Sequence, residues 1–129
     1  MQTDALSPAL QRAYDRLPEV LQHRTVLSLL QLSIAEDVDP RGEWRPGSFA
    51  PAQNDVTSVA TLDEEARLDG RLVAKEDGVV AGLPLARALF ALVDDALVLE
   101  GIVDDGARVE PGQTVARVAG PGRELLTGE

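Results

Sequence analysis

The chain has 129 residues, no cysteine and a formal net charge of -10 at pH 7. This length suits a single domain, and the lack of cysteine excludes disulfides, thiolate metal sites and cysteine nucleophiles. Binding to nucleic acid or acidic lipid relies on Lys and Arg, so the acidic balance, with Lys75 as the only lysine, argues against both partners. We find neither an apolar run long enough to span a membrane nor a leader-like N-terminus, and therefore expect a cytoplasmic protein without a membrane partner.

The first third of the chain, residues 1–37, is predicted to be helical. Ser7 and Pro8 form a helix start, with serine as the N-cap and proline in the first turn. Leucines at helical spacing predict a second helix from about Glu19 to Glu36.

Residues 38–55 are predicted to form a loop, because proline and glycine crowd into this stretch. We expect its aromatic residues, Trp44 and Phe49, to pack onto the domain or onto a partner.

His23 has no carboxylate or serine beside it in a recognised motif, so we interpret it as a packing or solvent-exposed residue.

Residues 56–120 are predicted to combine short strands with one helix. The strands are expected at Ala66–Ala74, Val79–Ala81, Leu97–Val103 and Thr114–Ala119, the helix from Pro84 to about Val93, and turns at Glu76–Gly78, Asp104–Gly106 and Glu110–Gln113. Gly78, Gly82, Gly106 and Gly112 are interpreted as turn glycines. Gly120 to Gly122 should end the last strand, and Arg123–Leu126 should begin a further helix. The fold class is therefore α+β, with N-terminal helices followed by a small, mostly antiparallel sheet and one internal helix.

Several short motifs follow one another in a fixed order along the chain. They are Ala35-Glu36-Asp37, Asp55-Val56-Thr57-Ser58, Asp77-Gly78-Val79-Val80-Ala81-Gly82, the pairs Asp105-Gly106 and Pro111-Gly112, and finally Gly120 with Arg123-Glu124-Leu125-Leu126-Thr127-Gly128-Glu129. Their order and spacing resemble the N-terminal region of quinolinate phosphoribosyltransferases, over roughly residues 29–129. The sequence departs from the family pattern in a longer 38–54 loop and in Asn54, which stands where glycine is common.

The resemblance implies a single α/β hammerhead domain over residues 1–129, with 121–129 beginning the helix that leads into a missing C-terminal barrel domain. It implies that the parent enzyme converts quinolinate and phosphoribosyl pyrophosphate to nicotinate mononucleotide, pyrophosphate and CO2 in NAD biosynthesis, using Mg²⁺. The family works as a homodimer in which this domain covers the mouth of the partner's barrel. We therefore expect a lid and dimer-interface role, and expect the 129-residue chain alone to bind no cofactor and to be inactive.

Candidate site residues follow from the same resemblance. Arg123, near the position of the family's active-site arginine, is a candidate for substrate binding, although an ion pair at the surface or between domains is the favoured interpretation. Glu36 and Asp37 oppose the dipole of the helix that they end. Together with Asp55 and Thr57, which could also cap a helix or turn, they are candidates for the interface or the rim of the active site. No catalytic or metal-binding residue is assigned.

Other functions remain open at this point. Related branches, such as nicotinate phosphoribosyltransferase or ModD-like proteins, share the domain pattern. The segment from Val103 to Ala116 also resembles the hairpin of biotinyl and lipoyl carrier domains, for which Lys75 would be the only cofactor-bearing lysine. A non-catalytic interaction domain is the remaining alternative.

Overall fold

A computed structural model describes residues 5–39, 41, 44–46 and 62–128. Its helices are α1 (Pro8–Arg16), the 3-10 turn η1 (Glu19–Leu21), α2 (Arg24–Val38), α4 (Leu83–Val93) and α5 (Gly122–Gly128); its strands are β1 (Arg67–Val73), β2 (Gly78–Val79), β3 (Val98–Gly101), β4 (Arg108–Val109) and β5 (Thr114–Pro121). The predicted α+β class is thus confirmed. Of the predicted loop, residues 38, 39, 41 and 44–46 lie within the described residues, and Val38 belongs to the end of α2 and not to the loop.

The N-terminal region differs from the prediction in one respect. Ser7 caps α1 as expected, since its hydroxyl accepts a hydrogen bond from the Leu10 amide at 3.4 Å. The single helix predicted from about Glu19 to Glu36 is wrong, because the chain makes the short turn η1, then extends, and begins α2 at Arg24. His23 lies in extended conformation at this break, and its Nδ1 accepts from the Thr25 amide at 3.1 Å. The histidine is therefore the N-cap of α2.

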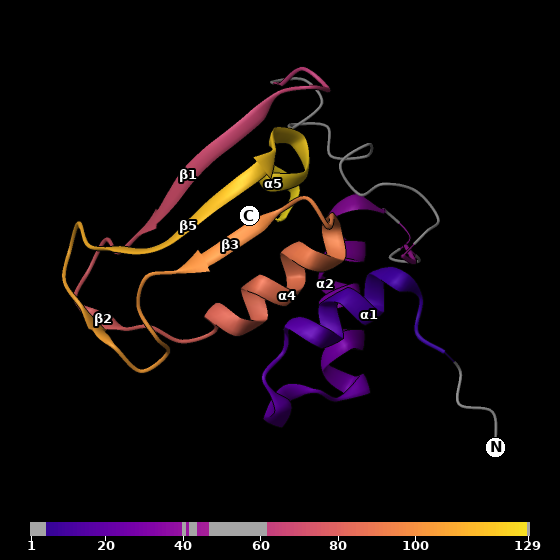
Figure 1. Ribbon diagram of the computed structural model, residues 1–129, viewed down its shortest axis with the longest axis horizontal. Helices are drawn as coiled ribbons and strands as arrows, with labels where there is room; N and C mark the ends of the chain where they lie inside the picture. Colours follow the sequence, from indigo (N-terminus) through magenta and orange to yellow (C-terminus); the bar gives the residue numbers. More distant parts are fainter. Residues whose placement is uncertain (1–4, 40, 42–43, 47–61, 129) are drawn as a thin grey trace.

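Two antiparallel sheets follow (Figure 1). The larger has the order β1-β5-β3, with β5 in the centre, and the smaller pairs β2 with β4. The short strand β4 was not predicted, and Gly78, predicted to be a turn residue, lies in its partner β2. By contrast, Gly82, Gly106 and Gly112 have positive φ angles, as turn positions require.

Strand β5 continues beyond its predicted end at Ala119, through Gly120 to Pro121. Gly120 has a φ of 145°, and a Cβ built there would lie 2.9 Å from the carbonyl oxygen of Ala96. Only glycine fits such a close backbone approach without a shift of its neighbours. Gly120 therefore does not end β5. It allows β5 to pass close to the backbone segment that leads into β3.

Helix α4 lies at the centre of the hydrophobic core. It packs against α1 and α2 on one side and against β3 and α5 on the other, so the helices lie on one face of the larger sheet (Figure 1). Leu92 of α4 is 2% exposed, and the core continues through Leu99 and Val118 of the sheet. Trp44 is 2% exposed and packs into the same core, whereas Phe49 lies outside the described residues.

Candidate functional site

The two acidic residues predicted to lie at an interface or an active-site rim are in the last turn of α2. Glu36 and Asp37 are both exposed there, and no basic residue shares that turn. This placement leaves their carboxylates at the surface of the domain. Asp55 and Thr57, which were predicted to share that role, lie outside the described residues.

Arg123 lies in the first turn of α5 and is half-buried. Its Nε donates a hydrogen bond to the carbonyl oxygen of Leu62 at 2.8 Å, which ties α5 to the segment before β1. Gly122 strengthens the same junction, because its amide donates to the Ala66 carbonyl at 2.7 Å. The Nε of Arg123 therefore has a structural role. Contact between Arg123 and a substrate stays a prediction.

A surface that the sequence reasoning missed is the outer face of the larger sheet. Arg71 of β1 lies opposite Arg117 of β5, which in turn lies opposite Glu100 of β3. Directly paired residues of an antiparallel sheet project to the same face, and all three are exposed. Alternation along β1 places Arg67 and Asp69 on this face as well. The alternating pattern of β1 was the available signal, but the partner strands could not be assigned from sequence.

The charge of this outer face is opposite in sign to that of the whole chain. Three arginines and two carboxylates give the face a formal charge of +1 (3 − 2), against -10 for the chain. Within the described part of the chain, Arg71 and Arg117 form no hydrogen bond or ion pair through their side chains. Their guanidinium groups are thus available for anionic partners, which arginine binds through two parallel hydrogen bonds.

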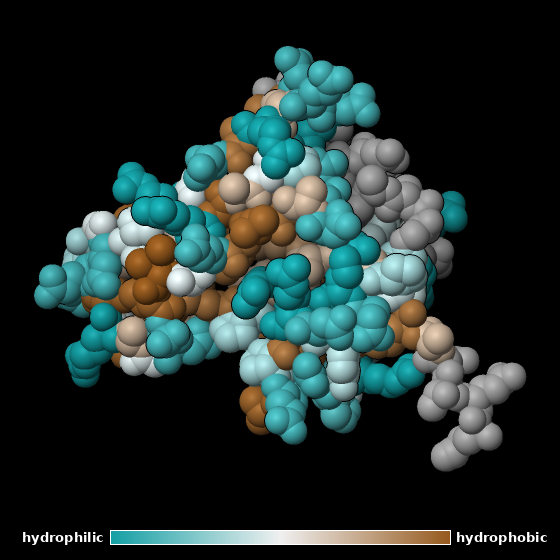
Figure 2. Space-filling view, in the orientation of Figure 1, coloured by the Kyte–Doolittle hydropathy of each residue, from teal (hydrophilic) through white to brown (hydrophobic). Residues whose placement is uncertain are grey.

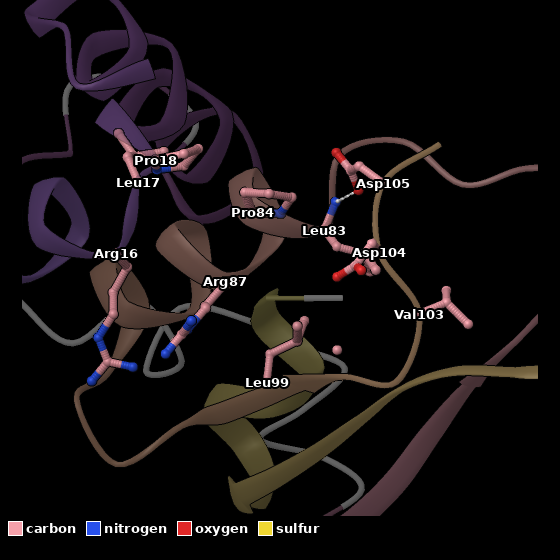
Figure 3. A pocket seen from close by; sticks show the side chains of 11 residues that line it. Arg16, Leu17, Pro18, Leu83, Pro84, Arg87, Leu99, Val103, Asp104 and Asp105 are labelled. Carbon is pink, nitrogen blue, oxygen red and sulfur yellow. Dashed lines mark hydrogen bonds between the residues drawn. The ribbon is translucent and has the colours of Figure 1, made fainter. Parts of the chain in front are cut away.

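A separate hollow lies on the helical side, between the end of α1, the start of α4 and β3 (Figure 3). Its volume is about 420 Å³. The lining residues are Arg16, Leu17, Pro18, Leu83, Pro84, Arg87, Leu99, Gly101, Val103, Asp104 and Asp105. Figure 2 shows apolar surface over β3 and around β2, bordered by hydrophilic residues.

Asp105 closes one end of this hollow and also caps α4. Its two carboxylate oxygens accept hydrogen bonds from the amides of Gly82 and Leu83, at 2.9 and 3.1 Å. The N-cap Gly82 has no side chain to do this, and Pro84 has no amide hydrogen. Asp105, which is distant in the sequence, therefore accepts the hydrogen bonds of the free amides at the start of α4. Its negative charge is favourable at a helix N-terminus.

Three further features of the described residues concern metal ligands, membrane-crossing helices and the carrier lysine. Among the residues that the structure describes, no cluster of three or more His, Cys, Asp or Glu side chains is arranged to hold a metal ion. The helices in that same part of the chain are too short or too polar to cross a membrane. Lys75, the residue that the carrier alternative needs, lies between β1 and β2, which belong to different sheets, and not at the tip of a hairpin of paired strands.

The fold and these surfaces define an α+β domain with a cationic open sheet face. The family model described as "Quinolinate phosphoribosyl transferase, N-terminal domain" matches residues 55–129. The chain therefore belongs to the quinolinate phosphoribosyltransferase N-terminal domain family, as the ordered motifs predicted.

Comparisons with individual proteins agree with this family. The chain is 33% identical over 102 residues to the chloroplastic nicotinate-nucleotide pyrophosphorylase (carboxylating) of Oryza sativa subsp. japonica, covering 79% of this chain and 24% of the relative. It is 37% identical over 100 residues to the probable nicotinate-nucleotide pyrophosphorylase (carboxylating) of Synechocystis sp., covering 78% of this chain and 29% of the relative. The crystal structure of NadC from Streptococcus pyogenes matches with a TM-score of 0.66 and 27% identity, over 81% of this chain and 33% of that chain. The matched part of the chain thus spans 24 to 33% of the length of these proteins.

Proposed function

We propose that this chain is the N-terminal domain of an enzyme that converts quinolinate and phosphoribosyl pyrophosphate to nicotinate mononucleotide, pyrophosphate and CO2. The family match and the names of the relatives support this reaction. In this proposal the domain acts in the cytoplasm, and a C-terminal barrel domain carries the chemistry. In the same proposal, the barrel and the substrate phosphates hold the Mg²⁺ of the complete enzyme.

The observation that carries the proposal is the open, positively charged face of the sheet. Both proposed substrates are anions, and their binding and reaction require cations that face the developing charge. Arg71 and Arg117 supply two guanidinium groups that face away from the core. We propose that this outer face covers the mouth of a barrel in the second subunit of a homodimer, so that the domain is both a lid and part of the dimer interface.

The residues singled out in the sequence have different roles in this proposal. Arg123, anchored through its Nε, is proposed to present its remaining nitrogens to the carboxylates of quinolinate. Glu36 and Asp37, exposed at the end of α2, are proposed to form part of the rim or interface, together with Asp55 and Thr57.

The experiment uses a chimera in which this chain replaces the corresponding domain of the Synechocystis relative. We expect quinolinate-dependent release of pyrophosphate by the chimera and none by residues 1–129 alone. Circular dichroism and sedimentation establish that both proteins are folded and report their oligomeric state. Pyrophosphate release by the isolated 129-residue chain would contradict the lid role, and a folded chimera without activity would contradict the assignment of this domain to the reaction.

A further inference from the structure

The hollow between α1, α4 and β3 lies on the helical side of the domain, and its residues play no part in the proposed lid. Two arginines line it: Arg16 from the last turn of α1 and Arg87 from α4. Figure 3 shows both side chains extending to the same side of the hollow. A carboxylate that reaches both guanidinium groups would form charge-assisted hydrogen bonds with them.

No anion from the described part of the chain performs this role. Neither Arg16 nor Arg87 has a side-chain hydrogen bond or ion pair with any described residue. The C-terminal end of α1 accounts in part for Arg16, because a cation is favourable at that end of a helix. It gives no reason for Arg87, which projects from the middle of a different helix. The pair therefore has the composition of a carboxylate-binding site.

The rest of the lining restricts which anion fits. Leu83, Pro84 and Leu99 provide an apolar wall next to the arginines. Asp104 and Asp105 lie at the opposite end, where Asp105 already caps α4. An apolar body would gain from contact with the wall, while a second acidic group at the far end would meet the negative charge of Asp104.

We infer that this hollow binds a small organic anion, with a carboxylate at one end and an apolar body of about two fused rings. The carboxylate pairs with Arg16 and Arg87, and the body lies along Leu83 and Leu99. A volume of about 420 Å³ is of the size that small-molecule sites have. The inference does not depend on the proposed enzymatic reaction.

The test follows ¹H–¹⁵N NMR spectra of the 129-residue chain during titration with three probes. These are 2-naphthoate, the uncharged 2-naphthalenemethanol, and 2,6-naphthalenedicarboxylate, which has an acid group at each end. We expect 2-naphthoate to shift the amide signals of Leu83, Arg87 and Leu99 in a saturable way, and to bind at least about tenfold more tightly than either other probe, because only it satisfies the arginines without meeting Asp104.

Variants then separate a built site from general attraction to cations. Arg87→Gln and Arg16→Gln should each weaken 2-naphthoate about tenfold, whereas Arg67→Gln, which removes the same charge from the sheet, should leave its affinity unchanged. Asp104→Asn should improve binding of the dicarboxylate. Equal affinity for 2-naphthalenemethanol, unchanged affinity in both hollow variants, or shifts spread over the sheet would overturn the inference. The spectra of the free variants show that each is folded.

Discussion

The two faces of the β1-β5-β3 sheet are built from alternating residues of the same strands, yet they differ in almost every physical property. On the inner face, Leu99, Ala116 and Val118 are buried against the helices. On the outer face, Arg71 and Arg117 are exposed and have no ion-pair partner in the described part of the chain. One strand can thus secure the fold with every second residue and leave the residues between free for interaction.

The largest effect is expected in the core beneath the inner face, because the core should contribute most to the free energy of unfolding. Leu92→Ala removes a side chain that is 2% exposed, so it should leave a cavity and lower the free energy of unfolding by about 3 kcal/mol. Leu32, in α2, is 58% exposed and gives a control in which the same substitution should cost less than about 0.5 kcal/mol. Urea denaturation monitored by circular dichroism measures both. Similar losses in the two variants would mean that α4 is not the centre of the core.

Neighbouring residues of β5 allow the most direct comparison of the two faces. Val118→Ala shortens a side chain that is 6% exposed on the inner face, with an expected loss of about 2 kcal/mol. Arg117→Gln changes the adjacent residue on the outer face, with an expected change within about 0.5 kcal/mol. Thermal and urea unfolding would report the two values. A large loss of unfolding free energy in Arg117→Gln would show that the outer face also stabilises the fold, which would contradict the difference between the two faces.

The third prediction concerns a residue that is exposed but structural. Asp105→Ala removes the carboxylate that accepts from the amides of Gly82 and Leu83, and should cost about 1 kcal/mol, as the loss of a helix cap does. Asp104→Ala removes the same charge from the neighbouring residue, and should change the free energy of unfolding by less than half as much. Amide hydrogen exchange at the start of α4 locates the effect. Equal effects would mean that the general charge matters and the cap does not.

Local signals in the sequence predicted the parts of the fold that depend on nearby residues. Ser7 caps α1, β1 lies within the predicted strand, and the Glu110–Gln113 turn forms with a hydrogen bond from the Gln113 amide to the Glu110 carbonyl. The break before α2 was missed, because the N-cap is a histidine and not one of the usual small polar residues.

Features that depend on residues distant in the sequence could not be predicted in this way. The two-residue strands β2 and β4 are too short to have a period of their own, and the Asp105 cap joins segments 22 and 23 residues apart. The same holds for the outer face, because the row formed by Arg71, Arg117 and Glu100 exists only once β5 pairs with both β1 and β3. Family motifs identified the domain, but they did not identify this row or the arginine pair of the hollow.

We propose that the outer face of the sheet acts on the substrates, whereas the inner face maintains the fold. Steady-state kinetics of the chimera with Arg71→Gln and Arg117→Gln, combined with its thermal unfolding, test this claim most directly. We predict that kcat/KM for the substrates falls at least about tenfold with the unfolding midpoint unchanged, because two cations next to anionic substrates are lost. An unchanged kcat/KM would contradict the account.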